Sequence, residues 1–213
     1  GQRVATVAAR KDELWLGFIR GHIQIVNTNS GYSRTPDLID SNGIAITKIL
    51  VTEESQEVLI ATYSQGLFRI TDSGTKSYSE DGSLPEKSIT VLFRSKSNIL
   101  LAVSENRVYQ HDPETDHFKE ILFEFGLGEK RPIIYAFNQG HDDDILIGTK
   151  EHGLFIWSRK KQIEKQFKLQ PAEDMSGLET STIYGIEPDM QGNLWCSTQN
   201  GIVKLNSRGG LIK

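Results

Sequence analysis

Residues 189–206 read Asp189-Met190-Gln191-Gly192-Asn193-Leu194-Trp195-Cys196-Ser197-Thr198-Gln199-Asn200-Gly201-Ile202-Val203-Lys204-Leu205-Asn206. In this stretch a polar turn leads into a short apolar run that ends in the small residue Ser197, and a second polar turn with Gly201 leads into another short run. Short runs bounded by turn residues are typical of β-strands. The stretch therefore predicts two strands joined by a tight turn.

Similar stretches occur four more times along the chain. Clear copies lie at residues 144–157 and 57–70, and weaker copies lie at residues 13–25 and 98–110. In all five copies the first run ends in a small residue: Gly17, Ala61, Ala102, Gly148 and Ser197. Consecutive members of this set are 44, 41, 46 and 49 residues apart. A period in the forties, made of short β runs without a helical stretch, is the signature of propeller blades.

Each copy is completed by an apolar run before these two strands and by a polar run after them. The apolar runs are the expected innermost strands, at residues 4–9, 46–51, 89–93, 133–137 and 183–186. The polar runs are the expected fourth strands, at residues 32–35, 76–78, 118–121 and 162–167. The sequence therefore predicts an all-β fold, a β-propeller of four-stranded antiparallel blades, with five repeats at residues 4–43, 44–86, 87–130, 131–179 and 180–213.

Small residues have two expected roles in each blade. The one that ends the second strand lies where neighbouring blades crowd together, because a larger side chain would clash there. The glycines Gly66, Gly153 and Gly201 supply a backbone with positive φ at little cost. In the third copy Asn106 or Arg107 stands in place of this glycine, and Asn106 is the better tolerated at positive φ.

Charge excludes some classes of partner. The chain of 213 residues has 24 basic and 28 acidic side chains, a formal net charge of -4, and the two signs are interspersed. Nucleic acid is not expected as a partner, because binding of phosphates needs a concentrated basic patch. The basic group Arg159, Lys160, Lys161, Lys165 and Lys168 is interpreted as the solvated faces of a strand pair. No membrane span and no leader sequence are recognised in the chain, so we expect any export signal or anchor to lie outside it.

The single cysteine and the tryptophans are assigned to the core. Cys196 is the only cysteine, so neither an internal disulfide nor a thiolate metal site is expected. Its side chain is expected to be buried within a strand. The three tryptophans, Trp15, Trp157 and Trp195, are expected to pack between blades.

One turn brings together candidate metal ligands. His141 is followed by Asp142, Asp143 and Asp144, and hard cations favour clustered carboxylates. Polar residues are expected in this turn in any case, and no glycine-punctuated ligand loop accompanies them, so no metal is predicted. The sequence has no zinc spacing among its histidines, no nucleophile elbow, no phosphate loop and no dinucleotide fingerprint. Consequently, neither a catalytic residue nor a cofactor is predicted.

The candidate ligand site lies on loops. In a propeller, the loops between second and third strands lie at the same end as the connections that enter the next blade, and recognition usually occurs on loops of a rigid frame. Polar and aromatic groups on these loops suit a hydroxyl-rich ligand, although plain solvent exposure is the favoured interpretation of any single one. The candidate residues are Arg20, Tyr63, Gln65, Lys87, Arg131, Glu151, His152, Gln199 and Asn200.

The quoted motif resembles a known repeat. Residues 183–189, 192–195, 198 and 201–202 closely resemble the two-component regulator propeller repeat, and residues 145–154 and 59–67 are similar to it. The resemblance implies an extracytoplasmic sensor of a bacterial signalling protein, often a hybrid histidine kinase that responds to carbohydrate fragments. It therefore implies a periplasmic or extracellular location, but it assigns no ligand residue, because the repeat motif is structural.

Three functions are weighed. The first is a non-catalytic sensor that binds a carbohydrate or another small polar ligand and signals to a domain elsewhere in the full protein. The second is a scaffold for protein interaction or dimerisation, and the third is a propeller lyase or hydrolase acting on polysaccharide. Members of the family usually carry seven or more repeats, so the five copies are either a fragment, which we favour, or a complete ring. A fragment would leave blade faces to be covered by missing blades or a second copy.

Overall fold

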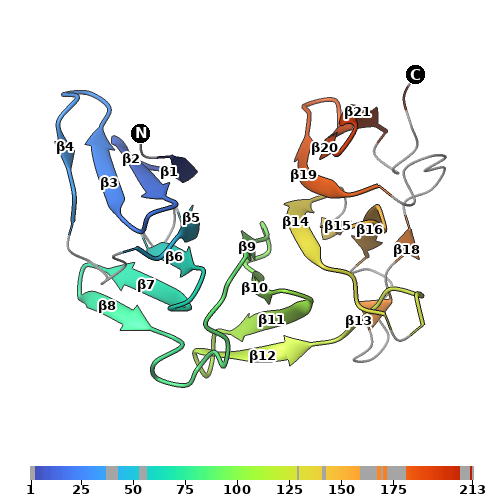
Figure 1. The fold of residues 1–213 in the computed structure, drawn as a ribbon, viewed down its shortest axis with the longest axis horizontal. Helices are drawn as coiled ribbons and strands as arrows, with labels where there is room; N and C mark the ends of the chain where they lie inside the picture. The colour runs from blue at the N-terminus through green and yellow to red at the C-terminus, as the bar shows by residue number, and fades with distance from the viewer. Residues whose placement is uncertain are drawn as a thin grey trace. The chain divides into compact units, whose positions relative to one another are not determined.

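The computed structural model describes residues 3–36, 43–52, 57–128, 130–140, 143–158, 167–168, 170–171, 181–206 and 212. Regular structure in these residues is β-strand, which confirms the predicted all-β class (Figure 1). Within these ranges no helix is long and apolar enough to cross a membrane. The strands form five antiparallel sheets and one parallel pair, and we call the five sheets blades 1 to 5.

Four blades contain four strands each, hydrogen-bonded in chain order. Blade 1 contains β1 (Val4–Arg10), β2 (Glu13–Phe18), β3 (Ile23–Asn27) and β4 (Ser33–Arg34). Blade 2 contains β5 (Ile46–Val51), β6 (Val58–Thr62), β7 (Leu67–Thr71) and β8 (Gly74–Ser77). Blade 3 contains β9 (Val91–Arg94), β10 (Leu100–Ser104), β11 (Arg107–Asp112) and β12 (His117–Ile121). Blade 4 contains β14 (Ile134–Gln139), β15 (Ile145–Thr149), β16 (Leu154–Trp157) and β18 (Gln170–Pro171).

Blade 5 has three strands among the described residues: β19 (Ile183–Pro188), β20 (Leu194–Thr198) and β21 (Gly201–Leu205). The parallel pair joins β13 (Phe123–Glu124) to β17 (Phe167–Lys168). The chain divides into two compact units. Unit 1 contains Gly1–Leu92, Leu101–Glu105 and Tyr109–Lys119, and unit 2 contains Phe93–Leu100, Asn106–Val108 and Glu120–Lys213.

The predicted fourth strand of blade 4 was wrong. It was placed at residues 162–167, but residues 162–166 lie outside the described part of the chain and Phe167 belongs to β17. Instead β18 pairs with β16, with Pro171 opposite Phe155 and Gln170 opposite Ile156. Which residues form the outer strand depends on how they pair with the neighbouring strand and not on their polarity alone. A polar run in the sequence therefore predicts the position of this strand only weakly.

Within each unit, the innermost strand of one blade lies against the blade before it. In unit 1, β5 contacts β1 and β2, and in unit 2, β19 contacts β14 and β15. The core between blades 1 and 2 is made of buried side chains from both: Trp15, Ile23, Ile25, Ile46, Ile49, Val58, Ile60, Phe68 and Ile70. The core between blades 4 and 5 is built in the same way: Ala136, Leu146, Leu154, Ile183, Ile186, Leu194, Cys196 and Leu205. This packing of sheet on sheet is that of a β-propeller.

The small residues occupy the predicted contact. A Cβ atom added to Gly17 would lie 2.6 Å from Cγ2 of Ile46, the first residue of β5. Correspondingly, a Cβ atom on Gly148 would lie 2.8 Å from Cγ2 of Ile183, the first residue of β19. Both isoleucines are fully buried. The small residue at the end of the second strand therefore admits an isoleucine from the next blade.

Four innermost strands share a β-bulge. In each, the pairing with the second strand shifts after the first residue, between Val4 and Thr6 in β1 and between Ile46 and Lys48 in β5. In blades 4 and 5 the shift lies between residues 134 and 136 and between residues 183 and 185. The extra residue of a bulge is left out of the ladder, and its side chain is turned to a new direction. The four extra residues are Ala5, Thr47, Tyr135 and Tyr184.

The turn of blade 3 differs from its prediction. Gly66, Gly153 and Gly201 have positive φ as expected, but in blade 3 the residue with positive φ (54°) is Glu105 and not Asn106. The connection between β10 and β11 contains two residues, whereas Gly66 and Gly153 end loops of four residues. The shorter turn shifts the left-handed conformation one residue toward the N-terminus.

One blade face carries exposed apolar side chains. Trp195 and Ile202 in blade 5 are 44% and 73% exposed. Trp15, which holds the position of Trp195 in blade 1, and Leu154, which holds the position of Ile202 in blade 4, are buried. Trp15 and Trp157 are buried as expected, but Trp195 is not packed between described blades. The face of blade 5 that corresponds to the face of blade 4 covered by blade 5 is therefore open within the described residues.

Candidate ligand-binding loops

The β15–β16 loop, residues 150–153, is fixed by its backbone on two sides. The Lys150 amide donates to the Ile133 carbonyl at 2.8 Å, and the Gly153 amide donates to the Ser181 carbonyl at 2.9 Å. Ile133 directly precedes β14, and Ser181 lies two residues before β19. The loop is therefore hydrogen-bonded to the segments that lead into two neighbouring innermost strands, β14 and β19. This is the arrangement predicted for a propeller.

The side chains of this loop are presented on that fixed backbone. Glu151 has φ of 61°, and its amide donates to Thr182 Oγ1 at 3.2 Å. The Glu151 carboxylate is exposed and lies 3.8 Å from Nζ of the exposed Lys150. His152 Nδ1 lies 2.8 Å from the Lys150 carbonyl, and because a carbonyl only accepts, Nδ1 carries a proton. The loop thus offers a carboxylate, an ammonium group and an imidazole.

Two tyrosines lie on the strands that this loop connects. Tyr135 and Tyr184 are the bulge residues of β14 and β19, and each follows a buried isoleucine. Their ring centroids are 5.6 Å apart and their planes are inclined by 28°, so the rings are stacked. They remain 37% and 54% exposed.

The sequence prediction missed both tyrosines because it considered only loops. A signal existed: the pair Ile-Tyr occurs at residues 134–135 and again at 183–184, at the same place in the repeat. Alternation places the isoleucine in the core and the next residue on the opposite side. The pairing register, which the sequence does not show, puts each tyrosine in a bulge.

Three other predicted residues lie in unit 2. Arg131 is exposed in the segment that leads to β14, and its guanidinium lies 3.2 Å from the Glu120 carboxylate. Gln199 and Asn200 are exposed in the β20–β21 turn, where the Asn200 amide donates to Thr198 Oγ1 at 3.1 Å. This turn occupies in blade 5 the place of residues 150–153 in blade 4. The Lys150 amide, next to Glu151 in the loop, bonds to the carbonyl of Ile133, two residues after Arg131.

Unit 1 repeats the arrangement of loops. The Gly43 amide donates to the Arg20 carbonyl, and the Tyr63 amide donates to the Ala45 carbonyl. The Gly66 amide donates a hydrogen bond to the Lys87 carbonyl at 2.6 Å. The Gln65 amide donates to Thr62 Oγ1. Tyr63 is 62% exposed and Arg20 and Lys87 are also exposed, whereas Gln65 is partly buried. A ligand role for all nine predicted residues stays a prediction.

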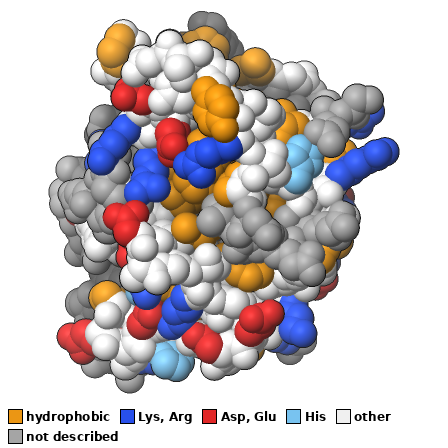
Figure 2. Space-filling model, turned by 90° about the vertical axis from the view of Figure 1, so that its left-hand side faces the viewer, with side chains coloured by type: hydrophobic (Ala, Val, Ile, Leu, Met, Phe, Trp, Pro, Cys, Tyr) orange, Lys and Arg blue, Asp and Glu red, His pale blue; other side chains and the backbone are white. Residues whose placement is uncertain are grey.

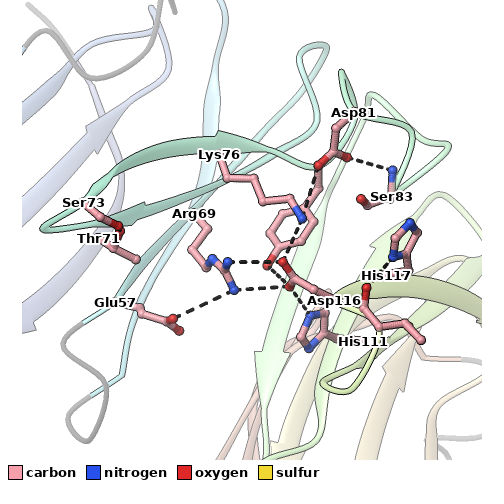
Figure 3. A network of polar contacts seen from close by, with 12 residues as sticks. Glu57, Arg69, Thr71, Ser73, Lys76, Asp81, Ser83, His111, Asp116 and His117 are labelled. Carbon is pink, nitrogen blue, oxygen red and sulfur yellow. Dashed lines mark hydrogen bonds and ion pairs between the residues drawn. The ribbon is translucent and has the colours of Figure 1, made fainter.

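A cluster of polar side chains surrounds Asp116 in the β11–β12 turn (Figure 3). Arg69 donates to both carboxylate oxygens of Asp116 at 3.2 Å, and Lys76 Nζ donates at 2.7 Å. The Tyr78 hydroxyl donates at 2.8 Å, and His111 Nε2 lies 2.9 Å from the carboxylate. Four side chains from two blades therefore converge on one carboxylate.

The electrostatics of this cluster indicate a structural role. Partial burial opposes ionisation of Asp116, but hydrogen bonds from Lys76, His111 and Tyr78 outweigh it and hold the pKa of Asp116 well below its usual range. Burial, and then the hydrogen bond to Asp116, raise the pKa of Tyr78. The carboxylate stays charged and saturated with donors, so it joins blades 2 and 3 and has no capacity left for a substrate.

Clustered metal ligands are absent from the described residues. In the part of the chain that the structure describes, no group of three or more His, Cys, Asp and Glu side chains could hold a metal ion. His141 and Asp142 of the aspartate run lie outside the described residues. Figure 2 shows one face of the molecule, on which basic and acidic side chains are interspersed.

Comparisons with known proteins identify the fold. Neither a protein-family model nor a curated protein sequence matches the chain. Among solved structures, it is similar to the extracellular domain of the hybrid two-component system BT4673 from B. thetaiotaomicron, with 22% identity and a TM-score of 0.72. The extracellular domain of BT3049 from the same organism has 18% identity and a TM-score of 0.74. The WD40 β-propeller domain of Doa1 has 13% identity and a TM-score of 0.66.

The coverage of these matches is unequal. The alignments cover 94%, 98% and 94% of this chain, but 27%, 29% and 62% of the chains of BT4673, BT3049 and Doa1 respectively. The chain thus spans less than a third of the two extracellular domains. These likenesses establish the β-propeller fold, and two of the three similar structures come from the class of protein that the sequence resemblance names.

Proposed function

We propose that this chain is part of a non-catalytic sensor of a bacterial signalling protein, located in the periplasm or outside the cell, that binds a carbohydrate or another small polar ligand. Two independent observations agree on this class of protein. The sequence motif of blade 5 resembles a sensor propeller repeat, and extracellular domains of two-component systems share the fold over almost the whole chain. In the full protein the sensor would pass the binding event to an output domain.

The observation that carries the ligand site is the anchoring of residues 150–153. Backbone hydrogen bonds to Ile133 and Ser181 fix the loop, while the side chains of Lys150 and Glu151 remain exposed. Binding groups on a preorganised loop lose less conformational entropy when a ligand binds. Hydroxyl groups of a sugar can donate to the carboxylate and accept from the ammonium group.

Thermal shift against a panel of oligosaccharides tests the proposal, because a ligand that binds only the folded state must raise the melting temperature. With the ligand found, the Glu151→Gln variant should bind about tenfold more weakly in calorimetry, which corresponds to the loss of a charge-assisted hydrogen bond. Glu114→Gln is the matched control, since Glu114 is an exposed glutamate on the β11–β12 turn. No thermal shift across the panel, or equal affinities for both variants, would contradict the proposed site.

A second candidate function is favoured by the open face of blade 5. The residues equivalent to its exposed Trp195 and Ile202 are covered, in blades 1 and 4, by the following blade. The chemistry of this face therefore suits another blade-like sheet, such as that of a second copy. Concentration-dependent association in ultracentrifugation, abolished by Ile202→Lys but not by Met190→Lys in the exposed β19–β20 turn, would support a scaffold. A monomer at all concentrations would exclude self-association.

A further inference from the structure

We propose that Tyr135 and Tyr184 form a stacking subsite for the apolar face of a pyranose ring. This inference rests on the proposed function and names the part of the ligand that the protein would hold at this place. The two rings are stacked on each other, yet 37% and 54% of these residues remain exposed. Stacking covers one face of each ring, so ring surface remains available to a ligand.

The tyrosines are not required by the fold. The same bulge position holds Ala5 in blade 1 and Thr47 in blade 2, so the bulge forms equally well with a small side chain. The buried contact at the strand entry is made by the preceding residue, Ile134 or Ile183. Blades 4 and 5 therefore carry a tyrosine at a bulge position whose structure does not require an aromatic side chain.

The bulge also explains why the two tyrosine rings are exposed to solvent. In a regular pleat, successive side chains point alternately into the core and away from it. A bulge increases the local twist and re-aims the extra side chain, and bulges are over-represented next to binding and active sites. Two bulges in register, one on β14 and one on β19, place the two rings within stacking distance.

The neighbouring groups determine the class of ligand. Ile133, which accepts the Lys150 amide, lies two residues before Tyr135, and Thr182, which accepts the Glu151 amide, lies two residues before Tyr184. An aromatic surface is thus next to a loop that carries opposite charges. Neither tyrosine hydroxyl forms a hydrogen bond to any residue that the structure describes, so both can donate or accept. A pyranose ring combines an apolar face with hydroxyl groups along its edge and matches this combination.

The experiment uses the chain with ¹³C-labelled tyrosine rings. Maltotriose, cellotriose and xylotriose are titrated separately, and ring shifts and affinities are measured by NMR and calorimetry. We expect one of them to shift the Tyr135 and Tyr184 signals, and Tyr135→Ala and Tyr184→Ala each to weaken its binding about three- to tenfold. The Phe variants should keep most of the affinity. Tyr32→Ala, at a residue that is 68% exposed in the β3–β4 turn, should bind as the unmodified chain does.

The outcomes separate the two proposals. If a trisaccharide binds and Glu151→Gln weakens it, but both alanine variants bind normally, the stacking subsite is wrong while the proposed function stands. If indole shifts the two tyrosine signals and no trisaccharide does, the pyranose assignment is wrong. If neither a trisaccharide nor indole binds, the stacking subsite is wrong, and the thermal shifts against the wider panel of oligosaccharides decide on the proposed function. Equal urea midpoints for all variants would show that loss of binding is not loss of folding.

Discussion

Cγ2 of Ile183 occupies the space that a side chain on Gly148 would need, because a Cβ atom there would lie 2.8 Å from it. The pair joins the second strand of blade 4 to the innermost strand of blade 5, and Gly17 and Ile46 form the same pair between blades 1 and 2. Three additional atoms of Ile183 and Ile46 lie within 3.1 Å of the two positions. At both places where the repeat has this glycine, the next blade therefore lies too close for a larger side chain.

Gly148→Ala should lower the free energy of unfolding by about 1–3 kcal/mol, the usual cost of overpacking a tight core. The nearest atom is the Cγ2 methyl carbon of Ile183, a β-branched and fully buried side chain that cannot move aside. Urea denaturation measures the change. In the double variant Gly148→Ala/Ile183→Ala, the glycine substitution should cost less than it does alone, because the obstructing methyl group is gone.

Ser197 provides the matched control. It occupies in blade 5 the position of Gly148, but it is exposed. Ser197→Ala should change the free energy of unfolding by no more than about 0.5 kcal/mol. If both substitutions lowered the free energy of unfolding equally, the effect of Gly148→Ala would come from the strand itself and not from contact between blades.

The repeat made much of this fold predictable. A period in the forties, with a small residue at one place in each copy, follows from the packing of similar sheets against one another. The sequence alone therefore predicts the close contacts at Gly17 and Gly148. The position of β18 was not predictable, because an edge strand is selected by its partner. Tyr135, Tyr184 and Asp116 were also missed, since their partners lie in other blades and only the pairing register brings them together.

Asp116 should contribute stability that depends on pH. Its pKa lies below the ordinary value of 3.8 because bonds from Lys76, His111 and Tyr78 outweigh its partial burial. A carboxyl group whose pKa is lowered by folding stabilises the protein above its unfolded pKa, and this contribution is lost as the pH falls toward the folded pKa. Asp116→Asn should therefore cost about 1–3 kcal/mol at pH 7, and the difference from the unmodified protein should shrink below about pH 4. Urea midpoints between pH 7 and pH 2.5 measure this.

Asp112 is the control for that effect. It lies on the same hairpin, where Lys119 Nζ donates to it at 2.8 Å, and this hydrogen bond lowers its pKa to about 2. Among the described residues, Asp112 pairs with one charged side chain, the exposed Lys119, whereas Asp116 is bonded to Arg69, Lys76, Tyr78 and His111, so Asp112→Asn should cost less than Asp116→Asn at every pH. A larger loss at Asp112, or a difference for Asp116 that grows on acidification, would contradict the structural role of the cluster.

Glu105→Gly should stabilise the protein by about 0.5–1 kcal/mol. Glu105 has φ of 54°, a conformation that costs a residue with a Cβ atom about 1 kcal/mol and that glycine adopts freely. The side chain is exposed, so little packing is lost. Asn106→Gly in the same turn should not stabilise, because Asn106 does not have positive φ. Thermal denaturation of the two variants checks the assignment, and a stabilising Asn106→Gly together with a destabilising Glu105→Gly would reverse it.

Cys196 should be unreactive until the core between blades 4 and 5 opens. Its side chain is fully buried in that core, and burial raises the pKa of the thiol to about 11. Thiolate is the reactive form, and at pH 8 it would be scarce even if a reagent could reach the sulfur atom. A disulfide reagent such as Ellman's should therefore label less than one tenth of the native protein in an hour at pH 8 and all of it in 6 M guanidinium. Gly148→Ala should accelerate labelling, since it loosens the same contact, whereas Ser197→Ala should not. Rapid stoichiometric labelling of the native chain would show that this core is open in solution.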